Sequence, residues 1–127
     1  MARQLLTTTV AAIDTSVPGA AGVLATLVLP ISADGARFEN AVGRNLLLFI
    51  NGLNAVSAVT TIITIQSVAD PHGREGDIVI TVAPGQVAVC GPFPPALFNQ
   101  PSGTDKGRVY VDYSAIHANA RHAVVRV

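Results

Sequence analysis

The sequence predicts an all-β domain, an antiparallel β-sandwich or jelly-roll-like barrel of about eight short strands. Half of its residues are hydrophobic and only 13% are charged, with Thr, Val, Ala and Gly abundant. Short β-prone runs alternate with turn signals about every 8–12 residues, and no run has the period of an amphipathic helix. The 127 residues suit one domain, residues 1–127, in which residues 1–33 are either a strand or an N-terminal arm.

The first third of the chain is predicted to contribute three extended segments. Residues 5–13 are rich in Thr and β-branched side chains and read as a strand that the Val-Pro-Gly turn at 17–19 ends. The apolar run 22–31 could be strand or helix, and its Val and Thr content favours a strand. After the Asp-Gly turn at 34–35, residues 37–40 are expected to form a short edge segment.

Two further runs are predicted to lie in the core. Residues 46–50 are apolar at every position and are flanked by Asn45 and Asn51, as in a central strand buried on both faces. Residues 58–67 form the most β-prone segment, with alternate residues Val59 to Ile65 on one face. Both runs are therefore expected to pack near the centre of the sandwich.

The stretch from 78 to 90 predicts a hairpin. Two alternating runs, 78–82 and 86–90, are separated by little more than Pro84 and Gly85. Proline fixes φ at the second position of a type II turn, and glycine supplies the positive φ of the third. We therefore expect the two runs to fold back and pair with one another.

A rigid corner is predicted to follow the hairpin. The Gly-Pro-Phe-Pro-Pro sequence at 91–95 cannot continue a central strand, because prolines lack the N–H that a ladder needs. Either the phenyl rings close one end of the sandwich, or the corner packs on a neighbouring subunit. The candidate interface residues are Phe93, Pro94, Pro95 and Phe98, with Arg37, Arg44 and Arg108 as candidates for ion pairs to another subunit or a larger partner.

Two strands are predicted in the last part of the chain. Residues 108–114 alternate, with Val109, Val111 and Tyr113 on one face, and a final strand spans about 121–127. Between the hairpin and the segment at 58–67, the loop 68–76 is charged and expected to be exposed.

Composition and motifs argue against several classes of function. Eight Lys and Arg balance eight Asp and Glu without a basic run, so no nucleic acid is expected as a ligand. Apolar windows at 15–33 and 45–69 are interrupted by Pro, Gly or Asn, so no membrane span is expected. Nothing at the N-terminus resembles a secretion signal. The single cysteine, Cys90, is predicted to be buried as a small hydrophobic side chain.

No enzymatic or metal site is predicted. A divalent ion could be held in one loop by Asp70, His72, Glu75 and Asp77. A solvated loop in which the aspartates cap turns is the favoured interpretation, and His117 and His122 would face opposite sides of an extended strand. No nucleophile stands beside a base, so we expect a protein without catalytic residues, metal or cofactor.

Several pieces in order carry a resemblance to a known family. They are an Asp-Gly turn at 34–35, a Phe-x-Asn segment at 38–40, a hydrophobic strand ending in Asn-Gly at 51–52, a Gly-Pro-Phe-Pro corner at 91–94, and a Gly-x-Val-x-Val-x-Tyr-Ser strand at 107–114. Together they cover roughly three quarters of the chain, and the corner is the most distinctive. In this succession the chain resembles the head decoration, or cement, proteins of tailed bacteriophages, small β-sandwich virion proteins often encoded beside the major capsid protein.

The resemblance implies a structural protein that binds the outer surface of the phage head and stabilises it. Its partners would be the major capsid protein and further copies of itself, with a homotrimer expected. It would be located on the virion, and in the host cytoplasm during assembly. The alternatives are a tail, spike or head-fibre component and a carbohydrate-binding sandwich. The last is disfavoured because the chain has no Trp and only two Tyr.

Overall fold

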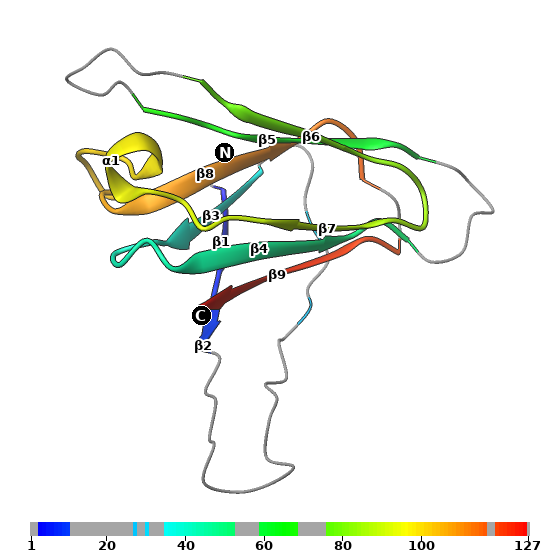
Figure 1. The fold of residues 1–127 in the computed structure, drawn as a ribbon, viewed down its shortest axis with the longest axis horizontal. Helices are drawn as coiled ribbons and strands as arrows, with labels where there is room; N and C mark the ends of the chain where they lie inside the picture. The colour runs from blue at the N-terminus through cyan, green and yellow to red at the C-terminus, as the bar shows by residue number, and fades with distance from the viewer. Residues whose placement is uncertain are drawn as a thin grey trace, which may run out of the picture.

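The computed structural model describes residues 3–10, 27, 30, 35–52, 59–68, 76–116 and 119–126, and confirms the all-β class. One sheet contains, in spatial order, β1 (Gln4–Leu6), β3 (Ala36–Glu39), β8 (Arg108–Tyr113), β5 (Thr61–Ile65) and β6 (Ile78–Val82). The other contains β2 (Thr8–Val10), β9 (Arg121–Arg126), β4 (Asn45–Ile50) and β7 (Val87–Cys90). The two sheets face each other, and a one-turn helix, α1 (Pro95–Phe98), lies at one end (Figure 1).

Alternation along the strands builds the core between the sheets. In β8 the odd-numbered residues, among them Val111 and Tyr113, are buried and the even-numbered ones are partly exposed, as predicted. In β5 the predicted face is also buried, whereas Ile62 is 41% exposed. The prediction that β4 is buried on both faces was wrong. Its buried residues, such as Phe49, alternate with partly exposed ones such as Leu48, because only one face of this sheet meets the other sheet.

The N-terminal segment differs from the prediction of one antiparallel strand. It forms β1 in one sheet and β2 in the other, on either side of Thr7. β1 pairs with β3 and β2 pairs with β9, both in parallel, whereas all other pairs among the described strands are antiparallel. Because β1 covers it, β3 is not the edge strand that was predicted.

Some predicted segments fall outside the described residues. This applies to 11–13 of the predicted first strand, to most of the run 22–31 and to most of the charged loop 68–76. Of the run 22–31, only Leu27 and Pro30 are described, and neither belongs to a strand.

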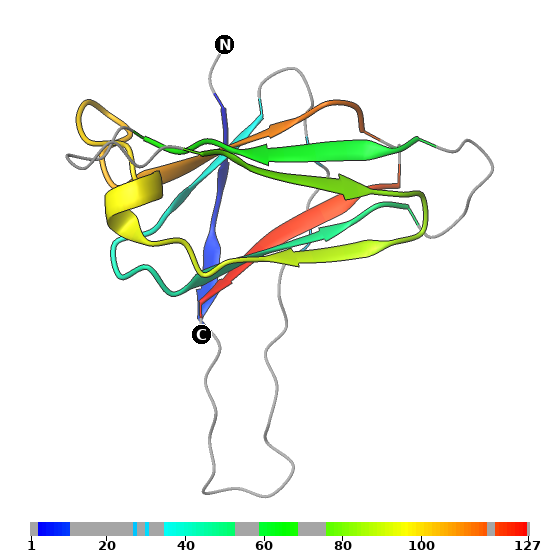
Figure 2. The same ribbon diagram turned by 45° about the horizontal axis from the view of Figure 1, so that its top comes forward.

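The predicted hairpin was wrong in its pairing, although its turn is present. Gly85 has a φ of 81°, and the Gln86 N–H donates to the Ala83 carbonyl (3.0 Å). However, β6 pairs with β5 and β7 pairs with β4, so the turn carries the chain from one sheet to the other (Figure 2). Asn51 anchors this arch, because its buried side-chain amide donates to the carbonyl of Val82 (2.8 Å).

Candidate interaction surfaces

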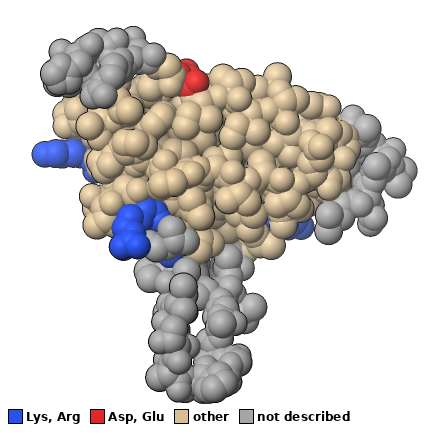
Figure 3. Space-filling model, viewed as in Figure 1, with Lys and Arg blue, Asp and Glu red and all other residues tan. Residues whose placement is uncertain are grey.

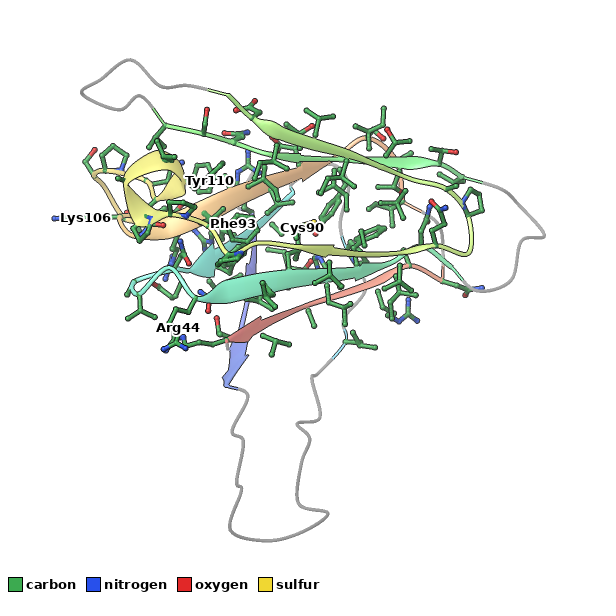
Figure 4. The ribbon with its side chains drawn as sticks, in the orientation of Figure 1. Arg44, Cys90, Phe93, Lys106 and Tyr110 are labelled. Carbon is green, nitrogen blue, oxygen red and sulfur yellow. The ribbon has the colours of Figure 1, made fainter. Side chains whose placement is uncertain are left out.

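The corner after β7 closes one end of the sandwich with aromatic rings. Gly91 has a φ of 122°, and a Cβ there would lie 2.6 Å from the carbonyl oxygen of Asn45, so the close approach of β4 requires glycine. Phe93 is fully buried between Phe38 and Phe98, with ring centroids 5.6 and 5.9 Å away (Figure 4). The two rings of the corner are therefore used inside their own chain.

Two asparagines hold the corner against the end of β3. The Asn40 side-chain amide donates to the Phe93 carbonyl (2.9 Å) and to Oδ1 of Asn99 (2.7 Å). In return, Asn99 Nδ2 donates to the Asn40 carbonyl (2.9 Å). In the sequence Asn40 is distinguished only as part of the Phe-x-Asn segment, although an asparagine directly after a strand is a common partner for loop backbone. Reciprocal bonds of this kind leave the corner little freedom to move.

The outer surface of the corner is exposed and apolar. Pro94, Pro95 and Ala96 all face solvent. Beside α1 lies a hollow of about 490 Å³, lined by Val68, Pro95, Ala96, Asn99, Gln100, Pro101, Lys106 and Gly107. Half of these residues are exposed and none is buried, so the hollow is a shallow depression suited to protein contact and does not enclose a small ligand.

Two of the three candidate arginines, Arg37 and Arg108, belong to an ionic network on the outer face of β3 and β8. Both place Nη1 near Oδ1 of Asp105, at 2.7 and 2.8 Å. Arg108 also contacts Glu39 through Nε (2.7 Å), and the Tyr110 hydroxyl donates to Asp105 (2.6 Å). The Tyr110 hydrogen bond and the guanidinium groups lower the pKa of Asp105. These arginines are paired within the chain and are poor candidates for contacts between subunits.

Arg3 joins the same face and was not predicted as a functional residue. Its Nη1 contacts Asp112 (2.6 Å) and donates to the carbonyl of Val111 (2.9 Å). Its guanidinium lies 4.4 Å from the ring centroid of Tyr110, a cation–π contact. Arg3 thus covers one face of the Tyr110 ring.

Arg44, the third candidate arginine, is free. It is exposed and makes no side-chain hydrogen bond or ion pair with another residue in the described part of the chain, and Lys106 is in the same situation. Figure 4 shows both side chains pointing away from the body of the molecule near the corner. They are the positive groups that a partner bound at this end would meet.

Three side chains from the two sheets, those of Tyr113, His122 and Gln4, lie within hydrogen-bonding distance of one another in a row. The Tyr113 hydroxyl lies 2.6 Å from Nδ1 of His122, whose Nε2 lies 3.1 Å from Oε1 of Gln4. Burial lowers the pKa of His122 to about 4 and raises that of Tyr113. Cys90 is buried as predicted, and burial raises the pKa of its thiol to about 11. Tyr113, His122 and Cys90 are therefore part of the buried interior.

The loop considered as a possible metal site lies outside the described residues except for Asp77, and so does His117. Oδ1 of Asp77 accepts hydrogen bonds from the backbone N–H and the hydroxyl of Ser67 (2.8 and 3.1 Å), which is a turn-capping role. Within the described ranges, no three His, Cys, Asp or Glu side chains come together as metal ligands. The same ranges contain no helix long and apolar enough to cross a membrane.

Comparison of the chain with protein-family models, curated proteins and solved structures found no match. The functional argument therefore depends on the surfaces themselves. Three differ in chemistry: the apolar corner with its free cations, the self-paired ionic face of β3 and β8, and the uncharged strands β6 and β7. The corner is the one for which the sequence resemblance suggests a partner.

Proposed function

We infer that the protein is a noncatalytic structural component of a phage virion, which binds the outside of the head and reinforces it. The major capsid protein would be its partner on the shell. The proposal is supported by the ordered pieces that resemble head decoration proteins, together with the chemistry of the corner. Reinforcement of a shell requires many shallow contacts repeated by symmetry, so that individually weak interfaces add up.

The observation that carries the proposal is the construction of the corner. It is the most distinctive piece of the resemblance, and Asn40 and Asn99 fix it by hydrogen bonds. Its outer side presents short, stiff residues, among them Pro94 and Pro95, which have little conformational entropy to lose on binding. We therefore assign the contact with the capsid to Pro94, Pro95 and Ala96, with Arg44 and Lys106 beside them.

The test is sedimentation of the purified protein with phage heads that lack it. Wild-type protein is expected to pellet with the heads. Ala96→Glu, which places a charge on the exposed surface of α1, is expected to stay in the supernatant. Thr60→Glu is the matched control, because Thr60 is exposed and directly precedes β5, at the opposite end of the sandwich from α1 (Figure 1).

Two results would count against the proposal. If wild-type protein does not sediment with heads, binding to the shell is excluded. If Ala96→Glu and Thr60→Glu bind equally well, the shell is bound by another surface. Electron cryomicroscopy of the virion would then distinguish the shell from the alternative location on a tail, spike or head fibre.

A carbohydrate-binding role has less support. Sugar platforms use exposed aromatic faces. Tyr113 is buried, and Tyr110 is covered by Arg3 and hydrogen-bonded to Asp105. Glycan binding that is lost in Tyr110→Ala would nevertheless restore this alternative.

A further inference from the structure

The strands on one side of the sandwich leave both sheets open. β6 is the last strand of the five-stranded sheet and β7 is the last strand of the four-stranded sheet. The turn at 83–86 joins them directly, so the two edges lie on the same side of the molecule (Figure 2). We call β6 and β7 together the open side. An open edge presents unpaired backbone groups to which another strand can bind.

The pairing of β5 shows which residues of β6 face outward. The Gln66 N–H donates to the carbonyl of Tyr110 (3.0 Å), so even-numbered residues of this strand direct their backbone groups to β8. Odd-numbered residues of β5 then face β6, where their partners are the even-numbered residues. The N–H and C=O groups of Val79 and Thr81 are therefore directed away from the sheet.

The same reasoning applies to β7. The Asn51 N–H donates to the carbonyl of Gln86 (2.9 Å), so odd-numbered residues of β4 face β7 and pair with its even-numbered residues. The N–H and C=O groups of Val87 and Val89 are left facing outward. Each edge thus presents two residues whose backbone groups have no partner strand among the described residues.

The side chains of the open side favour association. Val79, Val87 and Val89 are 62%, 53% and 63% exposed. From Ile78 to Cys90 the sequence contains no charged residue, and neither do β4 and β5 behind them. Figure 3 shows a similar scarcity of charge across the centre of one face, with Lys and Arg toward its margins. Solitary edge strands are commonly protected by lysine, proline or a bulge, and β6 and β7 contain neither residue.

We propose that the open side binds a second copy of this chain through a twofold axis, with β6 against β6 and β7 against β7, both antiparallel. In this register Val79 lies opposite Thr81 of the second copy and exchanges both N–H···O bonds with it. Val87 lies opposite Val89 of the second copy in the same way. The cross-strand neighbours are then β-branched pairs, which stabilise antiparallel ladders. Each sheet would continue without interruption into the second copy.

One axis can serve both edges. The midpoints of the two outward-facing pairs are Ile80 and Ala88, which are equally far along the chain from Pro84 in the turn. Because the chain reverses at that turn, the two midpoints come to the same level of the sandwich. A twofold axis perpendicular to the sheets joins each sheet to the same sheet of the second copy, with the core-facing sides of both on the same side of the continuous sheet.

A second copy fits this surface better than a single extended peptide. A peptide strand could cover β6 or β7 but not both, whereas another copy presents both edges at the matching separation. Identical surfaces also meet without like-charge repulsion, because neither edge is charged. This arrangement predicts a dimer at the open side in place of the trimer expected from the resemblance, and it does not depend on binding to a phage head.

The first test is the mass of the purified full-length protein by light scattering across a range of concentrations. Wild type is expected at twice the monomer mass of 13.1 kDa. The double variant Val79→Lys/Val89→Lys places a charge on each edge and is expected at the monomer mass, with an unchanged circular dichroism spectrum. Val42→Lys is the matched control, since Val42 is 56% exposed but lies in the turn before β4, and it should remain dimeric.

Amide hydrogen exchange gives a residue-specific readout. In the wild type the amides of Val79, Thr81, Val87 and Val89 are expected to be protected, although no strand of their own chain covers them. In the double variant they should exchange rapidly, while the amide of Ile80, which is bonded to β5, stays protected. A monomeric or trimeric wild type, a dimer that survives the double substitution, or rapid exchange at these four amides in the wild type would each overturn the proposal. None of these results would affect a test of head binding.

Discussion

Two regions of this molecule differ in whether their polar groups find partners within the chain. On what we call the polar side, formed by β1, β3, β8 and the corner, side chains distant in sequence bind one another, as Arg3 and Asp112 do at 2.6 Å. On the open side, β6 and β7 carry no charge, and outward backbone groups such as those of Val89 have no partner strand among the described residues. Charged residues therefore mark the face whose polar groups are paired within the chain. The uncharged strands mark the face that we propose binds a second copy.

The largest expected effect concerns the corner at the end of the polar side. Phe93→Ala removes a fully buried ring and should lower the free energy of unfolding by about 3–5 kcal/mol. Val42→Ala, at an exposed position near the same end, should change it by less than about 0.5 kcal/mol. Urea unfolding of both variants gives the comparison. Similar decreases in the free energy of unfolding of the two variants would show that the buried Phe93 ring does not stabilise this end of the sandwich.

The next effect is an acid-dependent loss of stability from His122. Its pKa is lowered to about 4, whereas the ordinary value is 6.5, so the unfolded chain takes up a proton first as the pH falls. The free energy of unfolding should therefore decrease as the pH drops from about 6.5 to about 4, by on the order of 2–3 kcal/mol. Urea unfolding at several pH values in this range should show that the free energy of unfolding of His122→Gln changes less with pH than that of the wild type. An equal change with pH in the two proteins would assign the loss of stability to other groups.

The smallest effect concerns the ionic face. Asp105→Asn should cost less than about 1 kcal/mol at neutral pH, because the pairs it makes are partly exposed. The pKa of Asp105 is lowered, so its contribution is present above the ordinary carboxyl pKa and is lost as the pH falls through the lowered value. Wild type and variant should converge in urea unfolding at acid pH and in high salt. A difference that persists under both conditions would exclude an ionic origin.

The sequence predicted faces of strands better than it predicted their partners. Alternation correctly identified which residues of β8 and β5 point inward, because burial of one face produces that pattern directly. It could not distinguish a hairpin from an arch at residues 78–90, since two alternating runs around a Pro-Gly turn look the same in both. The parallel pairs of β1 with β3 and of β2 with β9 join segments that are distant in the sequence, and no local pattern connects them.

In the candidate surfaces, too, local features were predictable from the sequence and contacts across the fold were not. The corner was recognisable because Pro and Gly act locally, but the burial of Phe93 and the anchoring role of Asn40 arise from contacts across the fold. The pairing of Arg37 and Arg108 with Asp105 could not be read from their spacing, because loop geometry determines it. The open side was not predicted at all. Its residues were assigned to each other as a hairpin, which would have hidden one edge of each strand.

The placement of β8 and β9 has a consequence for biosynthesis. β8 lies between β3 and β5, and β9 lies between β2 and β4, so the two described strands that come latest in the sequence occupy inner positions of both sheets. Contacts such as that between Gln4 and His122 span 118 positions and cannot form until His122 has emerged from the ribosome. Folding therefore depends on long-range closure, which is slow compared with local pairing. Until β8 and β9 are available, each sheet lacks an inner strand. The uncharged strands then remain exposed in an incomplete sandwich, where chaperones can bind them.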